Sequence, residues 1–168
     1  MSGYPSIPQA PQQLPSGASI RRFAQVSNAA NSTSTTANTT IMLPINNDGA
    51  FAFNYNNPTG FCSVDTDNDW IDVTSCSQYS DIEARITLRN PSAGNVSGQV
   101  VMRLIPDKTN PTVGVVDILS DQITFSTQSA VIATAYKGAT QAIRIGVRTT
   151  TNNTVELQGV YLKVWDVL

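Results

Sequence analysis

The chain has no histidine among its 168 residues. This absence excludes Ser-His-Asp and Cys-His catalysis, histidine metal sites and histidine pH switches. The sequence also lacks a glycine-rich phosphate loop of the Walker or Rossmann type. Glu83 and Glu156 are the only glutamates, and the strand pattern predicts an outward position for both. No carboxylate pair is singled out for glycoside chemistry, so we expect a protein that is not an enzyme.

Charged residues are scarce. They make up 13% of the chain, and ten Lys and Arg against twelve Asp and Glu give a net charge of −2. The only adjacent basic pair is Arg21-Arg22, whereas a nucleic-acid surface neutralises phosphates with clustered Lys and Arg. No run of eighteen apolar residues occurs, so we expect no membrane-spanning segment. We expect neither nucleic acid nor a membrane as a partner.

The first residues lack the charged and apolar regions of a secretory signal. We therefore expect the chain to begin near Met1 and to be made in a cytosol. Cysteine is scarce too, with Cys62 and Cys76 on either side of an acidic segment. The two thiols either meet in a disulfide across that segment or stay as two buried thiols. A reducing cytosol favours the second alternative.

Proline is concentrated at the N-terminus. Residues 1–18 contain prolines every three or four positions, with three larger apolar side chains between them. Proline fixes φ and removes a hydrogen-bond donor, so this arm is expected to be extended or disordered in isolation. It is either a solvated leader or an arm that docks on a partner. The docking side chains would be Tyr4, Pro5, Ile7, Pro8, Pro11, Leu14 and Pro15.

Beyond the arm, short alternating segments predict β-strands. Residues 20–26 form a candidate first strand, and the polar tract 27–40 is expected to be a loop. In residues 79–90, apolar side chains at even positions alternate with charged or polar ones, which is typical of a strand with one face in the core. The other candidate strands are residues 50–55, 61–64, 70–76, 100–105, 113–119, 122–127 and 129–136.

The last residues, 141–168, predict a hairpin around a polar turn at 150–153. The apolar row of the second strand changes phase at Gly159, which is typical of a β-bulge. About eight to ten short strands with regular turn signals, and no amphipathic helix, indicate an antiparallel sandwich or barrel. We divide the chain into an arm (1–18), a first strand with a polar loop (19–40) and a β-sandwich (41–168).

The segment 65–72 has carboxylates at alternate positions. Asp65, Asp67 and Asp69 resemble the opening of a calcium loop. An EF-hand is rejected, because Trp70 stands where the glycine is required and Cys76 where the closing glutamate is required. Calcium at a different kind of site and a solvated acidic loop remain the two alternatives. No other cofactor is expected.

Four aromatic residues have two interpretations. Trp70, Tyr136, Tyr161 and Trp165 either line a sugar-binding face or belong to the core, and aromatics in sandwiches are more often in the core.

The layout of the strands at 51–55, 79–89, 100–105, 113–119, 142–147 and 160–165 resembles a known group. It is similar to trimeric jelly-roll domains of the tumour-necrosis-factor and complement-head type, and especially to their relatives on tailed-phage heads. The resemblance covers roughly residues 40–168. It implies a jelly roll, a homotrimer, and a decoration or cement role on a shell of major capsid protein. Such a protein would be assembled in the host cytoplasm and would lie on the outer capsid surface of the virion.

Two other roles stay open. A receptor- or glycan-binding head of a phage fibre or tail would have an exposed aromatic or acidic pocket at the end far from the arm. A minor jelly-roll capsid subunit would form pentamers or larger closed assemblies.

Overall fold

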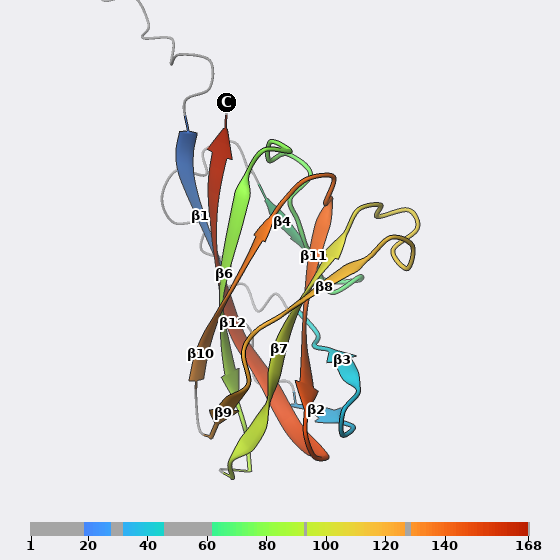
Figure 1. The fold of residues 1–168 in the computed structure, drawn as a ribbon, viewed down its shortest axis with the longest axis vertical. Coiled ribbons are helices and arrows are strands. Elements are labelled where there is room, and N and C mark those ends of the chain that lie inside the picture. Colours follow the sequence, from blue (N-terminus) through green and yellow to red (C-terminus); the bar gives the residue numbers. More distant parts are fainter. Residues whose placement is uncertain (1–18, 28–31, 46–61, 93, 127–128, 168) are drawn as a thin grey trace, which may run out of the picture.

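The computed structural model describes residues 19–27, 32–45, 62–92, 94–126 and 129–167. These residues form two antiparallel sheets that pack face to face (Figure 1). None of the described residues belongs to a helix long and apolar enough to cross a bilayer. The N-terminal arm, the predicted strand at 50–55 and the first residue of the one at 61–64 lie outside the described residues.

Twelve strands occur in the described part of the chain. They are β1 (Ser19–Ser27), β2 (Ser32–Thr35), β3 (Thr40–Met42), β4 (Ser63–Asp65), β5 (Trp70–Asp72), β6 (Asp81–Arg89), β7 (Val96–Ile105), β8 (Val116–Leu119), β9 (Ile123–Phe125), β10 (Ser129–Tyr136), β11 (Ala142–Thr149) and β12 (Asn153–Val167).

The strand order follows the path of a jelly roll. One sheet has the order β1-β12-β6-β10, with β2 also on β12. The other has the order β4-β5-β11-β7-β8, with β3 on β11 and β9 on β7. The pairs are nested along the chain: β1 with β12, β3 and β5 with β11, β6 with β10, and β7 with β8. This nesting is the double Greek key of a jelly roll, and it confirms the predicted fold class.

The core lies between the two sheets, where every second side chain of the long strands points inward. β6 shows the pattern most clearly, because its side chains alternate between core and surface along the whole strand. The buried row includes Ile82, Ala84, Ile86 and Leu88 on β6, Val100 and Met102 on β7, Ile143, Ile145 and Val147 on β11, and Val160, Leu162 and Val164 on β12. The alternation predicted for residues 79–90 and for the two segments of 141–168 is confirmed. The terminal hairpin itself was wrong, because β11 and β12 lie in different sheets and do not pair, so the polar turn at 150–153 connects the two sheets.

The predicted bulge lies in β12. Leu157 pairs with Leu88 and Gly159 with Thr87, so Gln158 is an extra residue in the ladder. A one-residue shift moves all later side chains of a strand to the opposite face. The bulge therefore keeps Leu157 and Val160 in the core, and it directs Tyr161, Lys163 and Trp165 outward.

The expectation for the polar tract 27–40 was wrong: it is not only a loop, because it contains β2, which pairs with the start of β12. Glu156 has the predicted outward position, opposite the exposed Arg89, but only 4% of its surface is accessible. Its carboxylate accepts a hydrogen bond from Ser32 Oγ (2.8 Å) and lies 3.7 Å from Arg89 Nε. Ser32 of the short strand β2 thus supplies a hydrogen bond that lowers the free-energy cost of burying the Glu156 carboxylate.

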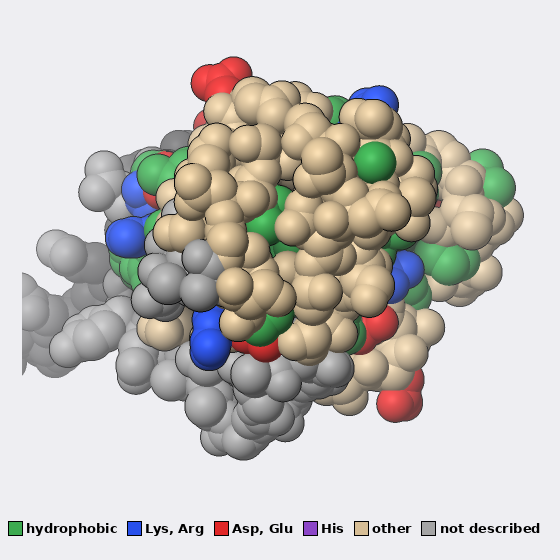
Figure 2. Space-filling view, turned by 90° about the horizontal axis from the view of Figure 1, so that it is seen from below, with side chains coloured by type: hydrophobic (Ala, Val, Ile, Leu, Met, Phe, Trp, Pro, Cys, Tyr) green, Lys and Arg blue, Asp and Glu red, His purple; other side chains and the backbone are tan. Residues whose placement is uncertain are grey.

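The start of β1 and the end of β12 share one end of the sandwich, because Ser19 pairs with Val167. The described part of the chain begins at Ser19, so we call this end of the sandwich the arm end (Figure 1). The opposite end includes the β6–β7 and β11–β12 turns. Figure 2 shows that its described surface consists mostly of uncharged polar side chains and backbone.

Strands β7 and β11 approach each other closely at Gly98. A Cβ atom there would lie 2.5 Å from the carbonyl oxygen of Arg148 and 3.0 Å from the Cα of Thr149. Both are backbone atoms of the paired strand, so they cannot move away without disturbing the ladder.

We expect Gly98→Ala to lower the free energy of unfolding by about 1–3 kcal/mol, the usual cost of overpacking. Gly94→Ala is the matched control, because its Cβ would come no closer than 3.6 Å to another heavy atom, Asn90 Nδ2. Urea unfolding of both variants measures the difference. Equal stability of the two variants would contradict the close approach.

Candidate functional site

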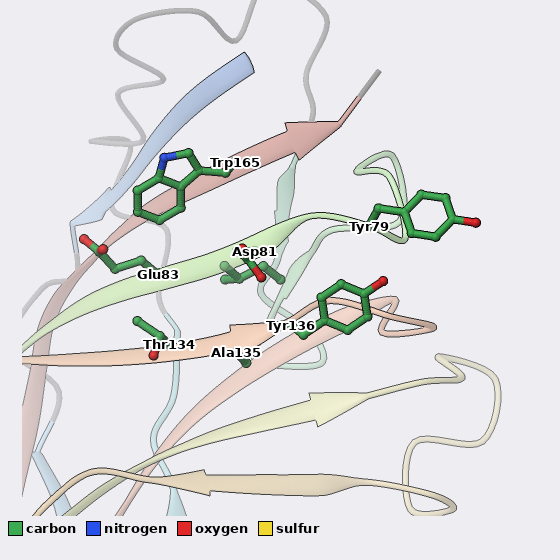
Figure 3. A pocket seen from close by; sticks show the side chains of 8 residues that line it. Tyr79, Asp81, Glu83, Thr134, Ala135, Tyr136 and Trp165 are labelled. Atoms are coloured by element: carbon green, nitrogen blue, oxygen red, sulfur yellow. The ribbon is translucent and has the colours of Figure 1, made fainter. Parts of the chain in front are cut away.

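The outer face of the β1-β12-β6-β10 sheet carries an aromatic row at the arm end. In register, Trp165 on β12 lies opposite Asp81 on β6, and Asp81 lies opposite Tyr136 on β10. Directly opposite residues in a sheet have their Cβ atoms about 4.5–5.5 Å apart. The register therefore places one carboxylate between two aromatic side chains, as Figure 3 shows.

The neighbouring row of the same face is polar. Lys163 lies opposite Glu83, and Glu83 lies opposite Thr134. Lys163 Nζ is 3.3 Å from a Glu83 carboxylate oxygen and 4.0 Å from the ring centroid of Trp165. The ammonium group thus neutralises Glu83 and covers part of the indole through a cation–π contact.

The two rows line a cleft of about 740 Å³, which we call the aromatic cleft (Figure 3). Tyr79, in the turn before β6, forms a further wall. The lining residues with functional groups are Tyr79, Asp81, Glu83, Thr134, Tyr136 and Trp165. The cleft offers exposed aromatic surface, two carboxylates and three hydroxyl groups, which are means of binding a ligand.

The predicted sugar-binding aromatics are only partly brought together. Trp165 and Tyr136 share the aromatic cleft. Trp70 is buried on the other sheet, as the core interpretation expects. Tyr161 lies on the same outer face but does not line the cleft. Its ring packs against Phe23 at a centroid distance of 5.8 Å.

Sequence reasoning missed Tyr79 and Asp81. A signal for both was present, because an aromatic residue in a turn and the first outward carboxylate of β6 stand two positions apart. Local pattern gives no reason to connect them with Trp165, which reaches them only through the pairing of β6 with β12.

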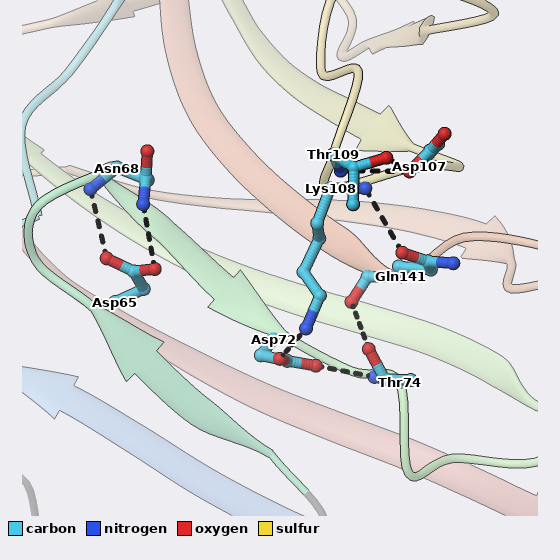
Figure 4. Close-up of polar contacts among 8 residues, drawn as sticks. All are labelled: Asp65, Asn68, Asp72, Thr74, Asp107, Lys108, Thr109 and Gln141. Atoms are coloured by element: carbon cyan, nitrogen blue, oxygen red, sulfur yellow. Dashed lines mark hydrogen bonds and ion pairs between the residues drawn. The ribbon is translucent and has the colours of Figure 1, made fainter.

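The acidic loop after β4 is held together by its own polar groups. Asp65 accepts hydrogen bonds from the backbone N–H groups of Asp67 and Asn68, both at 3.0 Å, and from Asn68 Nδ2 at 2.9 Å (Figure 4). The hydrogen bond from the Asn68 side chain is the main cause that lowers the pKa of Asp65. The Asp65 carboxylate therefore caps the turn.

Asp69, the third carboxylate of the calcium hypothesis, is bound to partners outside the acidic loop. Asp69 accepts a hydrogen bond from the backbone N–H of Ile45 at 3.0 Å and lies 3.6 Å from an Arg144 guanidinium nitrogen. Within the described ranges, no three His, Cys, Asp or Glu side chains form a group that could hold a metal ion. Calcium at Asp65, Asp67 and Asp69 stays a prediction.

Cys62 and Cys76 are both buried in the core between the sheets. In the described part of the chain they are not joined in a disulfide. Burial raises the pKa of the Cys62 thiol, and the nearby Cys76 and Asp72 add to the shift. This arrangement agrees with two buried thiols, and it makes Cys62 a poor nucleophile because the thiolate is the reactive form.

The loop after β7 forms polar contacts with β5 and with Gln141, the residue before β11. Lys108 Nζ forms an ion pair with Asp72, and the Lys108 backbone N–H donates to Gln141 Oε1 at 3.1 Å (Figure 4). Asp72 also accepts the backbone N–H of Thr74 at 2.8 Å. Burial opposes ionisation of Asp72, but the hydrogen bonds from Lys108 and Thr74 outweigh it and lower its pKa.

Strand β10 is an edge strand with no charged residue. Its sequence is S-A-V-I-A-T-A-Y, whereas β1, at the other edge of the same sheet, contains Arg21 and Arg22. Edge strands are usually protected from pairing by charges, by proline or by a cover. β10 has neither a charge nor a proline, so its free edge is suited to contact with another polypeptide.

The neighbouring edge of the second sheet is similar. The only charged residue of β8 is Asp117, and it is bound to Arg103 of β7 by two hydrogen bonds of 2.6 and 2.8 Å. Five of the seven exposed large apolar side chains of the described residues lie along β8, the loop before it and β10. They are Val113, Val116, Leu119, Ile132 and Tyr136. We call this surface the apolar edge.

A hollow of about 430 Å³ lies within the apolar edge, between β8 and β10. Its lining is mostly apolar and includes Leu104, Val116, Ile118 and Ala135. Exposed apolar patches of this kind mark association surfaces in proteins. The docking residues predicted in the arm, Tyr4 to Pro15, lie outside the described residues.

No protein-family model and no curated protein matches the chain. Among solved structures, it is similar to the PRD1 vertex protein P5, with a TM-score of 0.44 and 10% identity, covering 88% of this chain and 96% of that one. It is also similar to the CBM22-1-GH10 modules of Clostridium thermocellum xylanase 10B complexed with xylohexaose. That TM-score is 0.35 with 8% identity over 86% of this chain, which spans 26% of the other. At TM-scores this low, neither likeness carries an argument about function.

We expect Asp72→Asn to lower stability near neutral pH by about 1 kcal/mol or less, because both partners of the ion pair are partly exposed and solvent screens them. The lowered pKa means that the contribution of Asp72 is present above the ordinary Asp pKa of about 3.9 and is lost as the pH falls through the folded-state pKa.

Urea unfolding at several pH values between about 7 and 3 measures this contribution, and the difference between wild type and Asp72→Asn should shrink with acid. Substitution of the exposed Asp121 by Asn is the control and should leave the whole profile unchanged. A difference that stays constant down to the lowest pH would contradict this assignment to Asp72.

Proposed function

We propose that the chain is a structural virion protein, a decoration or cement trimer on the outer surface of a tailed-phage capsid. The observation that supports this proposal best is the apolar edge on β8 and β10. A jelly roll with such an edge has a surface that another chain can cover, and the sequence layout resembles trimeric phage-head domains. The sequence contains no histidine, so Ser-His-Asp and Cys-His active sites are absent from it.

In the proposed trimer, the apolar edge of each chain packs against a neighbouring copy. Ile132 on β10 and Leu119 on β8 are 58% and 43% exposed, and each large apolar side chain that becomes buried contributes about 1.5–3 kcal/mol. Covering the backbone of β10 also removes the free edge, which is otherwise open to non-specific pairing.

The arm supplies the second contact in this proposal. Its eighteen residues span about 56 Å if they adopt a polyproline helix, at about 3.1 Å per residue. An arm of that length reaches beyond the footprint of its own domain onto neighbouring shell subunits. Ordering it on binding costs conformational entropy, which buried apolar area at Tyr4, Ile7 and Leu14 offsets.

A receptor- or glycan-binding head is the second candidate, and the aromatic cleft favours it. However, a head that plugs into a shaft through its arm needs its ligand pocket at the far end. The aromatic cleft lies at the arm end, and the far end is mostly uncharged and polar (Figure 2). This placement favours the decoration role over the fibre head.

We expect Ile132→Lys to dissociate the trimer, raising its dissociation constant at least about tenfold, because a lysine at the contact loses the burial energy of the isoleucine and adds a charge. Sedimentation velocity measures the mass of the wild type and of the variant. Ser63→Lys, at the exposed start of edge strand β4, is the matched control and should remain a trimer.

A wild type that sediments at the mass of one chain would contradict the trimer. Pentamers or larger closed assemblies would instead indicate the minor capsid subunit. If Ile132→Lys stays trimeric, the interface lies elsewhere on the domain.

We further expect the wild type to cosediment saturably with capsid shells prepared without this protein from the virus that encodes it. A full-length variant with Tyr4, Ile7 and Leu14 replaced by Ser keeps the prolines and should bind at least about tenfold more weakly. Equal binding of the two proteins would exclude the arm as the docking element. Failure of the wild type to bind shells would overturn the decoration role.

A further inference from the structure

The trimer contact and the arm do not account for the composition of the aromatic cleft. Tyr136, 56% exposed, borders the apolar edge as well, but Tyr79, 61% exposed, and the carboxylates of Asp81 and Glu83 lie outside that edge. Exposed tyrosines present a flat apolar face and a hydroxyl group to a ligand. In Figure 3, Asp81 lies between Tyr136 and Trp165, so polar and aromatic groups alternate across the sheet.

We propose that the aromatic cleft binds a neutral saccharide. A sugar ring has an apolar C–H face, which packs against an aromatic side chain, and a rim of hydroxyl groups. Tyr79 and Tyr136 supply aromatic surface. The carboxylates of Asp81 and Glu83 accept hydrogen bonds from sugar hydroxyls, and Thr134 Oγ1 both donates and accepts.

The charges around the cleft select against anionic ligands. Asp81 and Glu83 contribute two negative charges, and Lys163, paired with Glu83 at 3.3 Å, contributes one positive charge. An anionic sugar would therefore meet a net negative charge. A neutral polyhydroxylated ligand uses the hydrogen-bonding capacity of the two carboxylates without this repulsion, and binding of a cation instead is an outcome that the test distinguishes.

The proline-rich arm is a poorer occupant of the same cleft. Residues 4–15 have no charged side chain, and four of them are prolines without a backbone N–H donor. An arm seated there would bring no positive charge to the Asp81 carboxylate. The cleft volume of about 740 Å³ also falls within the range of small-molecule sites, about 300–1,000 Å³.

The first test is a glycan array of neutral and acidic oligosaccharides probed with the full-length protein. We expect retention on neutral glycans and not on acidic ones. The retained oligosaccharide is then titrated by NMR, with choline chloride as the cationic probe. Saturable shifts for the neutral glycan, and none for choline at about 10 mM, are the expected result.

Two pairs of variants locate the site. Tyr79→Ala and Asp81→Asn should each weaken binding of the retained glycan at least about tenfold. Tyr161→Ala, on the same outer face but outside the cleft lining, and Asp121→Asn, at an exposed turn, should bind like the wild type. Thermal unfolding confirms that all four variants fold.

The proposal is overturned if no neutral glycan is retained, if choline or acidic glycans bind instead, or if the cleft variants bind as tightly as their controls. It does not rest on the capsid role, because glycan binding and shell binding are measured separately and either can fail alone.

Discussion

β12 pairs with three other strands of one sheet, and its register determines which of its side chains lie on the outer face of that sheet. It runs for fifteen residues and pairs with β1, β2 and β6. The extra residue at Gln158 changes its phase, so that Val160, Leu162 and Val164 enter the core. Without the bulge, the following odd-numbered residues would face inward. Lys163 and Trp165 therefore reach the aromatic cleft because of a one-residue irregularity.

Much of this fold was predictable, because the long strands each keep one face in the core. β6 has strict alternation, β11 keeps Ile143, Ile145 and Val147 on one face, and Gly159 marked the bulge. β2 had no such signal, since Ser and Thr alternate with each other and the strand is fixed by pairing with β12. Its inward Thr35 is satisfied by a 2.8 Å hydrogen bond from Thr149. Burial of Glu156 depends on the same unpredicted strand.

The candidate sites were less predictable than the fold because, like β2, they depend on which strands pair with one another. Trp165, Asp81 and Tyr136 come from three strands, and only the order β12-β6-β10 places them in one row. The apolar edge also depends on the strand order. Val131, Ala133 and Ala135 predict a strand at β10, but local sequence does not say that β10 is the last strand of its sheet.

The two surfaces have different chemistry and different positions. The apolar edge offers uncharged backbone and aliphatic side chains, which suit a flat contact with another chain. The aromatic cleft, on the adjoining sheet face, offers one carboxylate between aromatic rings and a second in the neighbouring polar row, which suit a small polar ligand. Tyr136 borders both surfaces, so assembly at the edge would fix one wall of the cleft.

Amide hydrogen exchange of β10, measured above and below the concentration at which the protein associates, tests the edge contact most directly. A free edge strand exchanges its outward amides quickly, and a covered one is protected. The account predicts that protection at β10 and β8 rises with association, while the short edge strand β4 is unchanged. Fast exchange at β10 in a fully associated sample would contradict it, because the uncharged edge would then remain open in the assembly.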